Sequence, residues 1–275
     1  MRKLSDRLLW GTMAASVLLV IAVLIFILMY IISQSIGHLD MQFLLGSDAE
    51  GGILPMAVTT LYVIAASLLL ALPAGILTAI FLNEYAGDTR PVRILRLAIE
   101  TLAGIPSILY GLFGLLVFCR ILKFGQSIIA GAFTLSIMIL PVIIRTTEEA
   151  LKTIPDTFRE GSLSLGATKF QTIRHVIIPQ AMPGIITAAI LAIGRVVGES
   201  APVLLTVGIT RNLPRSIFES GRTMTIHLYY LTKEAISPND FGKAFATAAL
   251  LIILVVIINT ATRIISIRFN KRMGA

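Results

Sequence analysis

The chain has 275 residues, of which 56% are hydrophobic and only 14% are charged. A water-soluble domain carries roughly a quarter charged residues, so this composition excludes an ordinary soluble protein and indicates a polytopic membrane protein. The net charge of +8 does not indicate nucleic-acid binding, because most Lys and Arg flank apolar runs instead of alternating with aromatic residues. That placement is typical of charges that orient helices in a membrane.

The N-terminal part, residues 1–53, joins a basic head, an apolar run and a polar segment. Residues 8–32 are apolar throughout and long enough to cross a bilayer. No cleavage signal ends this run cleanly, so we predict a retained first transmembrane helix. The polar segment that follows holds Asp40, Asp48 and Glu50 but no Lys or Arg, which predicts an outer loop.

Residues 54–267 are predicted to form the core domain, with five further transmembrane helices. Its apolar runs cover residues 54–82, 95–118, 127–144, 184–207 and 244–267. Basic residues concentrate in the segments assigned to the cytoplasm, including the tail 268–275, so both termini are expected there. Pro73 and Gly75 inside the second span predict a kink or close helix packing. The fold class is therefore all-α, with six transmembrane helices.

The cytoplasmic loop 145–182 contains a polar, amphipathic segment at residues 157–179. Asp156 or Thr157 is predicted to cap a short helix, with Glu160 in its first turn near the positive end of the helix dipole. Gly166 suits the left-handed residue that ends a helix. The apolar side chains of such a helix favour a partner groove; the alternative is an amphipathic helix on the membrane surface.

This segment resembles the cytoplasmic loop of MetI-like permeases, the membrane subunits of binding-protein-dependent ABC importers. The matching positions are Glu160-Gly161-Ser162, Gly166 and the run that ends at Pro179; Gly161 and Ser162 replace two alanines of the family motif. The resemblance implies a coupling helix that docks on an ATPase through Glu160, Gly161, Ser162, Leu163, Gly166 and Ala167. The chain lacks a phosphate-binding loop, so we predict a non-catalytic subunit without a cofactor or metal, whose partner uses ATP and Mg.

Two pairs of charged residues are candidates for a substrate pathway. Arg195 and Glu199 fall within the fifth predicted span, four residues apart and so on one helix face. A charge at the bilayer centre costs about 2.5–3.5 kcal/mol, so such residues are functional candidates. Arg145 and Glu148 lie at the inner end of the fourth span, and a guanidinium matches phosphate oxygens. A structural ion pair at Arg195 and an interfacial arginine at Arg145 remain the alternatives.

Three patches, residues 81–86, 104–114 and 194–202, resemble the PstA-type group of phosphate ABC permeases. The resemblance implies a phosphate importer in a bacterial or archaeal cytoplasmic membrane. Its expected partners are a PstC-type sister permease, two PstB-type ATPase subunits, a PstS-type phosphate-binding protein and membrane lipid.

Three other functions stay open at this stage. The first is a permease for another oxyanion, such as sulfate or molybdate, which an arginine face alone does not distinguish from phosphate. The second is a membrane enzyme acting on phosphorylated lipid, although His38, His175 and His227 are assigned to opposite membrane sides and so cannot form one site. The third is a scaffold, which would not need Arg195 and Glu199.

Overall fold

A computed structural model describes residues 2–46, 52–87, 89–234 and 238–272, which form helices and connecting segments with no strand in these ranges. The all-α class is confirmed, whereas Asp48 and Glu50 of the predicted outer loop lie outside the described ranges. The helices, with the short 3-10 and π segments labelled η, are α1 (Arg2–Ser35), η1 (Ile36–His38), α2 (Met41–Leu45), α3 (Leu54–Ile80), η3 (Phe81–Tyr85), α4 (Arg90–Ala103), α5 (Ser107–Gly114), η4 (Leu115–Ile121), α6 (Ile128–Lys152), α7 (Asp156–Ser164), α8 (Lys169–Thr172), η5 (Ile173–Ile177), α9 (Ile178–Gly198), α10 (Ala201–Thr206), α11 (Met224–Glu234) and α12 (Pro238–Arg272).

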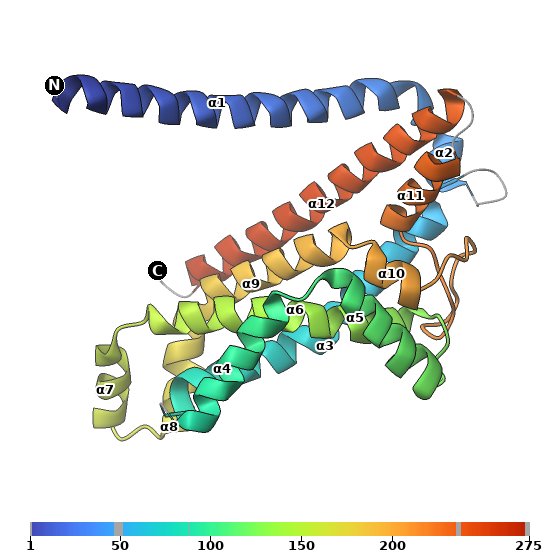
Figure 1. Cartoon of the computed structure of the whole chain (residues 1–275). Helices are drawn as coiled ribbons and strands as arrows, with labels where there is room; N and C mark the ends of the chain where they lie inside the picture. The colour runs from blue at the N-terminus through green and yellow to red at the C-terminus, as the bar shows by residue number, and fades with distance from the viewer. Residues whose placement is uncertain (1, 47–51, 88, 235–237, 273–275) are drawn as a thin grey trace.

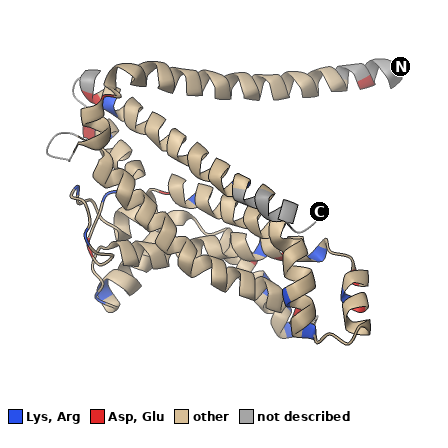
Figure 2. Ribbon diagram, turned by 180° about the vertical axis from the view of Figure 1, so that it is seen from behind, with Lys and Arg blue, Asp and Glu red and all other residues tan. Residues whose placement is uncertain are grey.

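Within the described residues, five helices are long and apolar enough to cross a membrane, and a bent helix pair raises the number to six. The five correspond to the first, second, fourth, fifth and sixth predicted spans. Lys, Arg, Asp and Glu gather at the two ends of the bundle and are sparse between them (Figure 2). In Figure 1, α1 begins and α12 ends on the same side as α7, whereas α2 and α11 lie on the opposite side.

The centre of the bundle is α6, which packs against α3 on one side and α9 on the other. Leu135, Met138 and Ile139 of α6 are at most 1% exposed. The predicted close packing at Gly75 is confirmed, because a Cβ there would lie 2.6 Å from Ile143 Cγ2. A Cβ on Gly184 of α9 would likewise collide with the Ala150 side chain of α6. The backbones therefore approach closely at both crossings, as small residues allow in membrane bundles.

The first span, α1, lies at the outside of the bundle (Figure 1). None of the 18-residue apolar window in this span is buried within the chain. The C-terminal end of α1 contacts α12, and there the rings of Tyr30 and Phe245 meet edge to face, with their centroids 5.6 Å apart. The rest of the helix presents apolar side chains outward, as expected for a helix surrounded by lipid or by another membrane subunit.

The third span is not the continuous helix that we predicted for residues 95–118. It is split into α4 and α5–η4, which are bent by 100°. Pro106 causes the break, since it lacks a backbone N–H and adopts an extended conformation (φ −56°, ψ 136°). The Tyr110 hydroxyl then donates a 2.6 Å hydrogen bond to the Leu102 carbonyl across the bend.

The fourth and fifth spans also differ from their predicted limits. Helix α6 continues to Lys152, beyond the predicted end at residue 144, because its polar last turns still pack on the bundle. Helix α9 stops at Gly198 and α10 starts at Ala201, so the predicted helix 184–207 is interrupted. In a continuous helix the Pro202 ring would clash with the Gly198 carbonyl. Glu199 is accordingly extended, with φ −77° and ψ 134°.

The segment before the last span, which we predicted to lie outside, contains a helix that the sequence did not predict, α11, with His227 only 9% exposed. Burial, together with the charges of Arg222, Arg211 and Lys243, lowers the pKa of His227 from 6.5 to about 4. A lowered pKa in the folded protein means that the unfolded chain binds more protons between these two pH values. The contribution of neutral His227 to folding stability is therefore fully present above about pH 6.5 and is lost as the pH falls toward 4.

We expect His227→Gln to reduce this acid sensitivity. Protonation of His227 in the unfolded chain should cost the wild-type protein about 2 kcal/mol of folding free energy between about pH 7 and about pH 4.5. Thermal unfolding of both proteins in detergent at the two pH values measures the effect. The difference in melting temperature between the two pH values should be several degrees smaller in the variant, and equal differences would contradict the buried-histidine explanation.

Candidate functional site

Helix α7 stands off the bundle at the end where the fourth and fifth spans meet (Figure 1). Its N-cap is Pro155, which makes no side-chain cap, so the predicted capping by Asp156 or Thr157 is wrong. Pro155 already has the extended conformation that precedes a helix, and α7 therefore begins at Asp156. Asp156 is the acidic residue of the first turn, where it favours the positive end of the dipole. Glu160 follows one turn later and is exposed.

The end of α7 has the predicted glycine. Gly166 has a φ of +86°, in the left-handed region that glycine adopts without steric cost. Its N–H donates to the Leu163 carbonyl at 2.9 Å, and the Ala167 N–H donates to the Ser162 carbonyl at 3.3 Å. These two bonds form a Schellman motif. The chain therefore turns sharply after α7 and leads into α8.

The outward surface of α7 and α8 is apolar at several positions. Leu165 is 90% exposed and Phe170 is 63% exposed. Phe158 and Leu163 are each about half exposed. A Cβ on Gly161 would meet no atom within 4 Å, so the glycine is not required by packing inside the chain. A group of exposed apolar side chains of this kind is a candidate surface for contact with another molecule.

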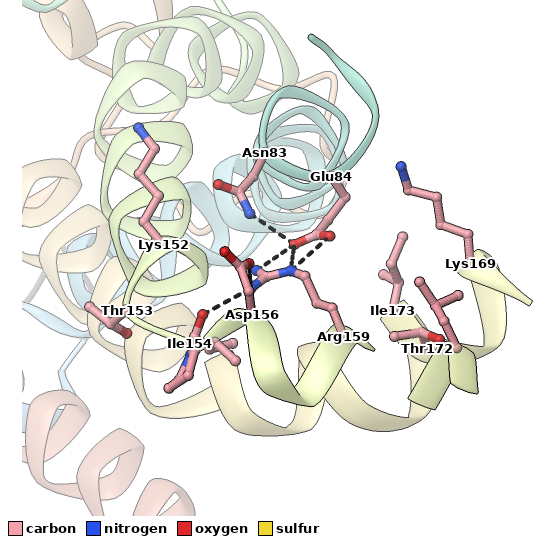
Figure 3. Close-up of a pocket in the computed structure, with 12 residues that line it drawn as sticks. Asn83, Glu84, Lys152, Thr153, Ile154, Asp156, Arg159, Lys169, Thr172 and Ile173 are labelled. Carbon is pink, nitrogen blue, oxygen red and sulfur yellow. Dashed lines mark hydrogen bonds and ion pairs between the residues drawn. The ribbon is translucent and has the colours of Figure 1, made fainter. Parts of the chain in front are cut away.

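The base of α7 is joined to the bundle by a buried ion pair between Arg159 and Glu84, which the sequence analysis missed. Their side chains are 19% and 6% exposed, and Arg159 Nη2 lies 2.8 Å from Glu84 Oε1. The pair borders a pocket of about 600 Å³ that Lys152 and Lys169 also line (Figure 3). The hydrogen bond to Glu84 raises the pKa of Arg159 above its ordinary value. No local sequence pattern predicts this pair, because its two residues are 75 positions apart, although Glu84 falls in one of the three family-like patches.

Arg195 and Glu199 face one another, but at the end of α9 rather than in the middle of a span. Arg195 Nε lies 3.9 Å from Glu199 Oε1, with side chains 30% and 17% exposed. Arg195 belongs to the last helical turn and Glu199 is the C-cap residue. The guanidinium is therefore held in place but retains accessible surface.

Arg145 and Glu148 do not interact with one another. Arg145 pairs with Glu149 at 3.4 Å on an exposed surface. Glu148 is nearly buried, and its Oε1 forms two ion pairs, with Arg96 Nη2 at 3.0 Å and with Lys152 Nζ at 2.9 Å. All five residues border a cavity of about 240 Å³ between α4 and α6. Three cations border this cavity, and the carboxylates of Glu100, Glu148 and Glu149 border it as well.

The two candidate arginines occupy different depths of the bundle. Gly184 of α9 packs against Ala150 of α6, so these two residues lie at the same depth along the bundle axis. At a rise of 1.5 Å per residue, Arg195 lies about 16 Å beyond this level and Arg145 about 8 Å beyond it. The predicted site residues thus form two positions along the bundle axis instead of one binding site.

Comparison with known proteins identifies the family of this architecture. The family described as "Binding-protein-dependent transport system inner membrane component" matches residues 71–274. A probable ABC transporter permease protein of Bacillus subtilis (strain 168), YqgI, is 33% identical over 291 residues, covering 100% of this chain and 99% of that protein. The phosphate transport system permease protein PstA 1 of Mycobacterium tuberculosis (strain CDC 1551 / Oshkosh) is 38% identical over 235 residues, which are 85% of this chain and 76% of that protein.

The fold is shared with solved importers. A bacterial alginate ABC transporter, crystallised with an alginate-loaded periplasmic protein, has a chain that superimposes with a TM-score of 0.73. The match covers 97% of this chain and 96% of that chain at 14% identity, which supports the fold alone. Together, the family match and the likeness to two permeases, to YqgI over nearly the full length, confirm the resemblance found in the sequence. The chain therefore belongs to the inner membrane components of binding-protein-dependent transport systems, the MetI-like permease subunits of ABC importers.

Proposed function

We propose that the chain is the permease subunit of an ATP-driven importer of inorganic phosphate. The observation that carries the choice of phosphate is the 38% identity to a phosphate permease over 85% of the chain. The half-buried guanidinium of Arg195 supports it, because a planar fork of donors fits phosphate oxygens. Arg145, which borders the cavity with Glu148, is a second position that the anion reaches later on its way to the cytoplasm.

The chain supplies the path and other subunits supply the energy. A PstC-type sister permease completes the pore, two PstB-type ATPase subunits bind ATP and Mg, and a PstS-type protein delivers phosphate from outside. The exposed apolar side chains around Leu163 and Leu165, with Glu160 and the open Gly161, form the surface that docks on the ATPase. Both termini are cytoplasmic in this proposal, which agrees with their position on the side of α7 (Figure 1).

Glu199 has a specific role in this pathway. A free carboxylate repels an anion, so Glu199 either neutralises Arg195 while the site is empty or accepts a hydrogen bond from the P–O–H group of a partly protonated phosphate during passage. The binding is transient, since an ion held tightly within a pathway is released slowly. Unchanged phosphate uptake by Glu199→Gln would remove both parts of this role.

Reconstitution tests the proposal. The chain is purified with the three partner types and placed in liposomes that contain ATP, and uptake of labelled phosphate, sulfate and molybdate is followed. We expect phosphate uptake that requires both ATP and the binding protein. Uptake of sulfate or molybdate without phosphate would assign the chain to another oxyanion, and uptake independent of ATP would contradict the proposed coupling.

A further inference from the structure

A single side chain, that of Arg159, connects α7 to two other helices. Its Nη1 donates to the Ile154 carbonyl at 2.8 Å and to Asp156 Oδ1 at 3.0 Å. Its Nη2 donates to the Leu151 carbonyl at 3.1 Å and to Glu84 Oε1 at 2.8 Å, and its Nε reaches both Glu84 oxygens at 3.2 and 3.3 Å. Arg159 thus binds the end of α6 and the end of α3–η3 at once (Figure 3).

Glu84 is placed where a carboxylate needs a cation. It lies in η3, at the C-terminal end of the long helix that begins with α3, and the negative end of a helix dipole disfavours an acidic side chain. It is also almost fully buried, with Asn83 Nδ2 donating to Oε1 at 2.8 Å. A buried charge without its partner is strongly unfavourable. Arg159 is therefore the cation that compensates the buried charge of Glu84 and holds its carboxylate in place.

The two residues supply a link that the covalent chain lacks. Helix α7 continues directly from α6 and leads through α8 and η5 into α9, so any displacement of α7 reaches those helices through the backbone. Helix α3 has no such connection. Apolar packing of Leu82 with Ile154 and Ile173 holds its end against the insert, and Arg159–Glu84 is the directional, charged bond between them.

We propose that Arg159 and Glu84 are positioning residues that transmit the displacement of α7 to α3. The proposal rests on the coupling role of α7 given under the proposed function. The second span, which packs against α6 at the centre of the bundle, then moves together with the helices that the ATPase displaces. Loss of the pair should weaken the transmission of the motion to α3, whereas the apolar contacts of Leu82 persist and should leave the fold and assembly intact.

The test uses Glu84→Gln in the complete importer reconstituted in liposomes. We expect normal assembly and a basal ATPase rate within about twofold of wild type. Stimulation of hydrolysis by phosphate-loaded binding protein, and phosphate uptake, should each fall by about tenfold or more, in line with the loss of a charge-assisted bond. The double variant Glu84→Arg/Arg159→Glu should recover part of the uptake, which a purely steric role would not allow.

Asp156→Asn is the matched control. It removes the other carboxylate that Arg159 contacts, but this side chain is 83% exposed, and exposed ion pairs contribute little. Uptake should stay within about twofold of wild type. Wild-type stimulation and uptake in Glu84→Gln would overturn the proposal. Failure of the Glu84→Gln complex to assemble would also overturn it, because the pair would then have a structural role. If the wild-type importer itself shows no ATP-driven uptake, the proposed function fails instead.

Discussion

Arg195→Gln should reduce phosphate uptake by about tenfold to a hundredfold, while the importer assembles normally. The guanidinium is the only group of α9 beyond its first turns that offers several donors to an anion, and it is held 3.9 Å from Glu199. A charge-assisted hydrogen bond is worth roughly 1.5–3 kcal/mol, which corresponds to that range of rates. Arg195→Lys keeps the charge but loses the planar fork, so uptake should be intermediate. The measurement is the initial rate of labelled phosphate uptake in liposomes.

A second variant separates a pathway role of Arg195 from a structural one. If the pair only holds the bundle together, Arg195→Gln leaves Glu199 unpaired, and replacing both residues by Gln should restore activity. If Arg195 contacts the ion, the double variant should be as inactive as the single one. Lys233→Gln provides the control, since it removes an exposed cation of α11 on the opposite side of the bundle from α7. Recovery of uptake in the double variant would contradict the pathway.

Apolar runs were sufficient to predict the position of most spans but not their internal breaks. Hydropathy measures only how apolar the side chains are, whereas the breaks at Pro106 and Pro202 arise from the backbone, through a missing N–H and a ring clash. The end of α6 was predicted too early because Arg145 and the charged residues after it were taken to lie outside the helix. In the fold these charges stay helical, since Arg96 of α4 and Lys152 compensate the buried Glu148.

The candidate site divides in the same way into local and distant features. The spacing of four residues predicted that Arg195 and Glu199 can pair, although Glu199 ends α9 in an extended conformation, and a single glycine predicted the left-handed turn at the end of α7. Both features are local in sequence. The bond of Arg159 to Glu84 joins residues 75 positions apart and depends on how the insert folds back on α3. No periodicity records such a contact, and only the assembled bundle reveals it.

Leu165→Asp should weaken the association of the chain with its ATPase partner by about tenfold to a hundredfold and stop ATP-driven uptake. Leu165 is 90% exposed, so the substitution removes almost no contact within the chain and should leave membrane insertion and folding unchanged. A side chain that anchors an interface centre costs about 2 kcal/mol of binding free energy when it is removed, and a buried new carboxylate adds its own desolvation cost. Association is measured with purified components in detergent.

The matched control for Leu165→Asp is Leu213→Asp, which makes the same change at a leucine that is 49% exposed. Leu213 lies between α10 and α11, on the side of the bundle opposite α7, so the ATPase should bind this variant as it binds wild type. The comparison isolates location, because both variants add one charge and remove one exposed leucine. Equal affinity of the two variants would mean that α7 does not form the docking surface. Weak binding by Leu165→Asp alone would show that the ATPase meets the chain at the apolar end of α7, next to the turn made by Gly166.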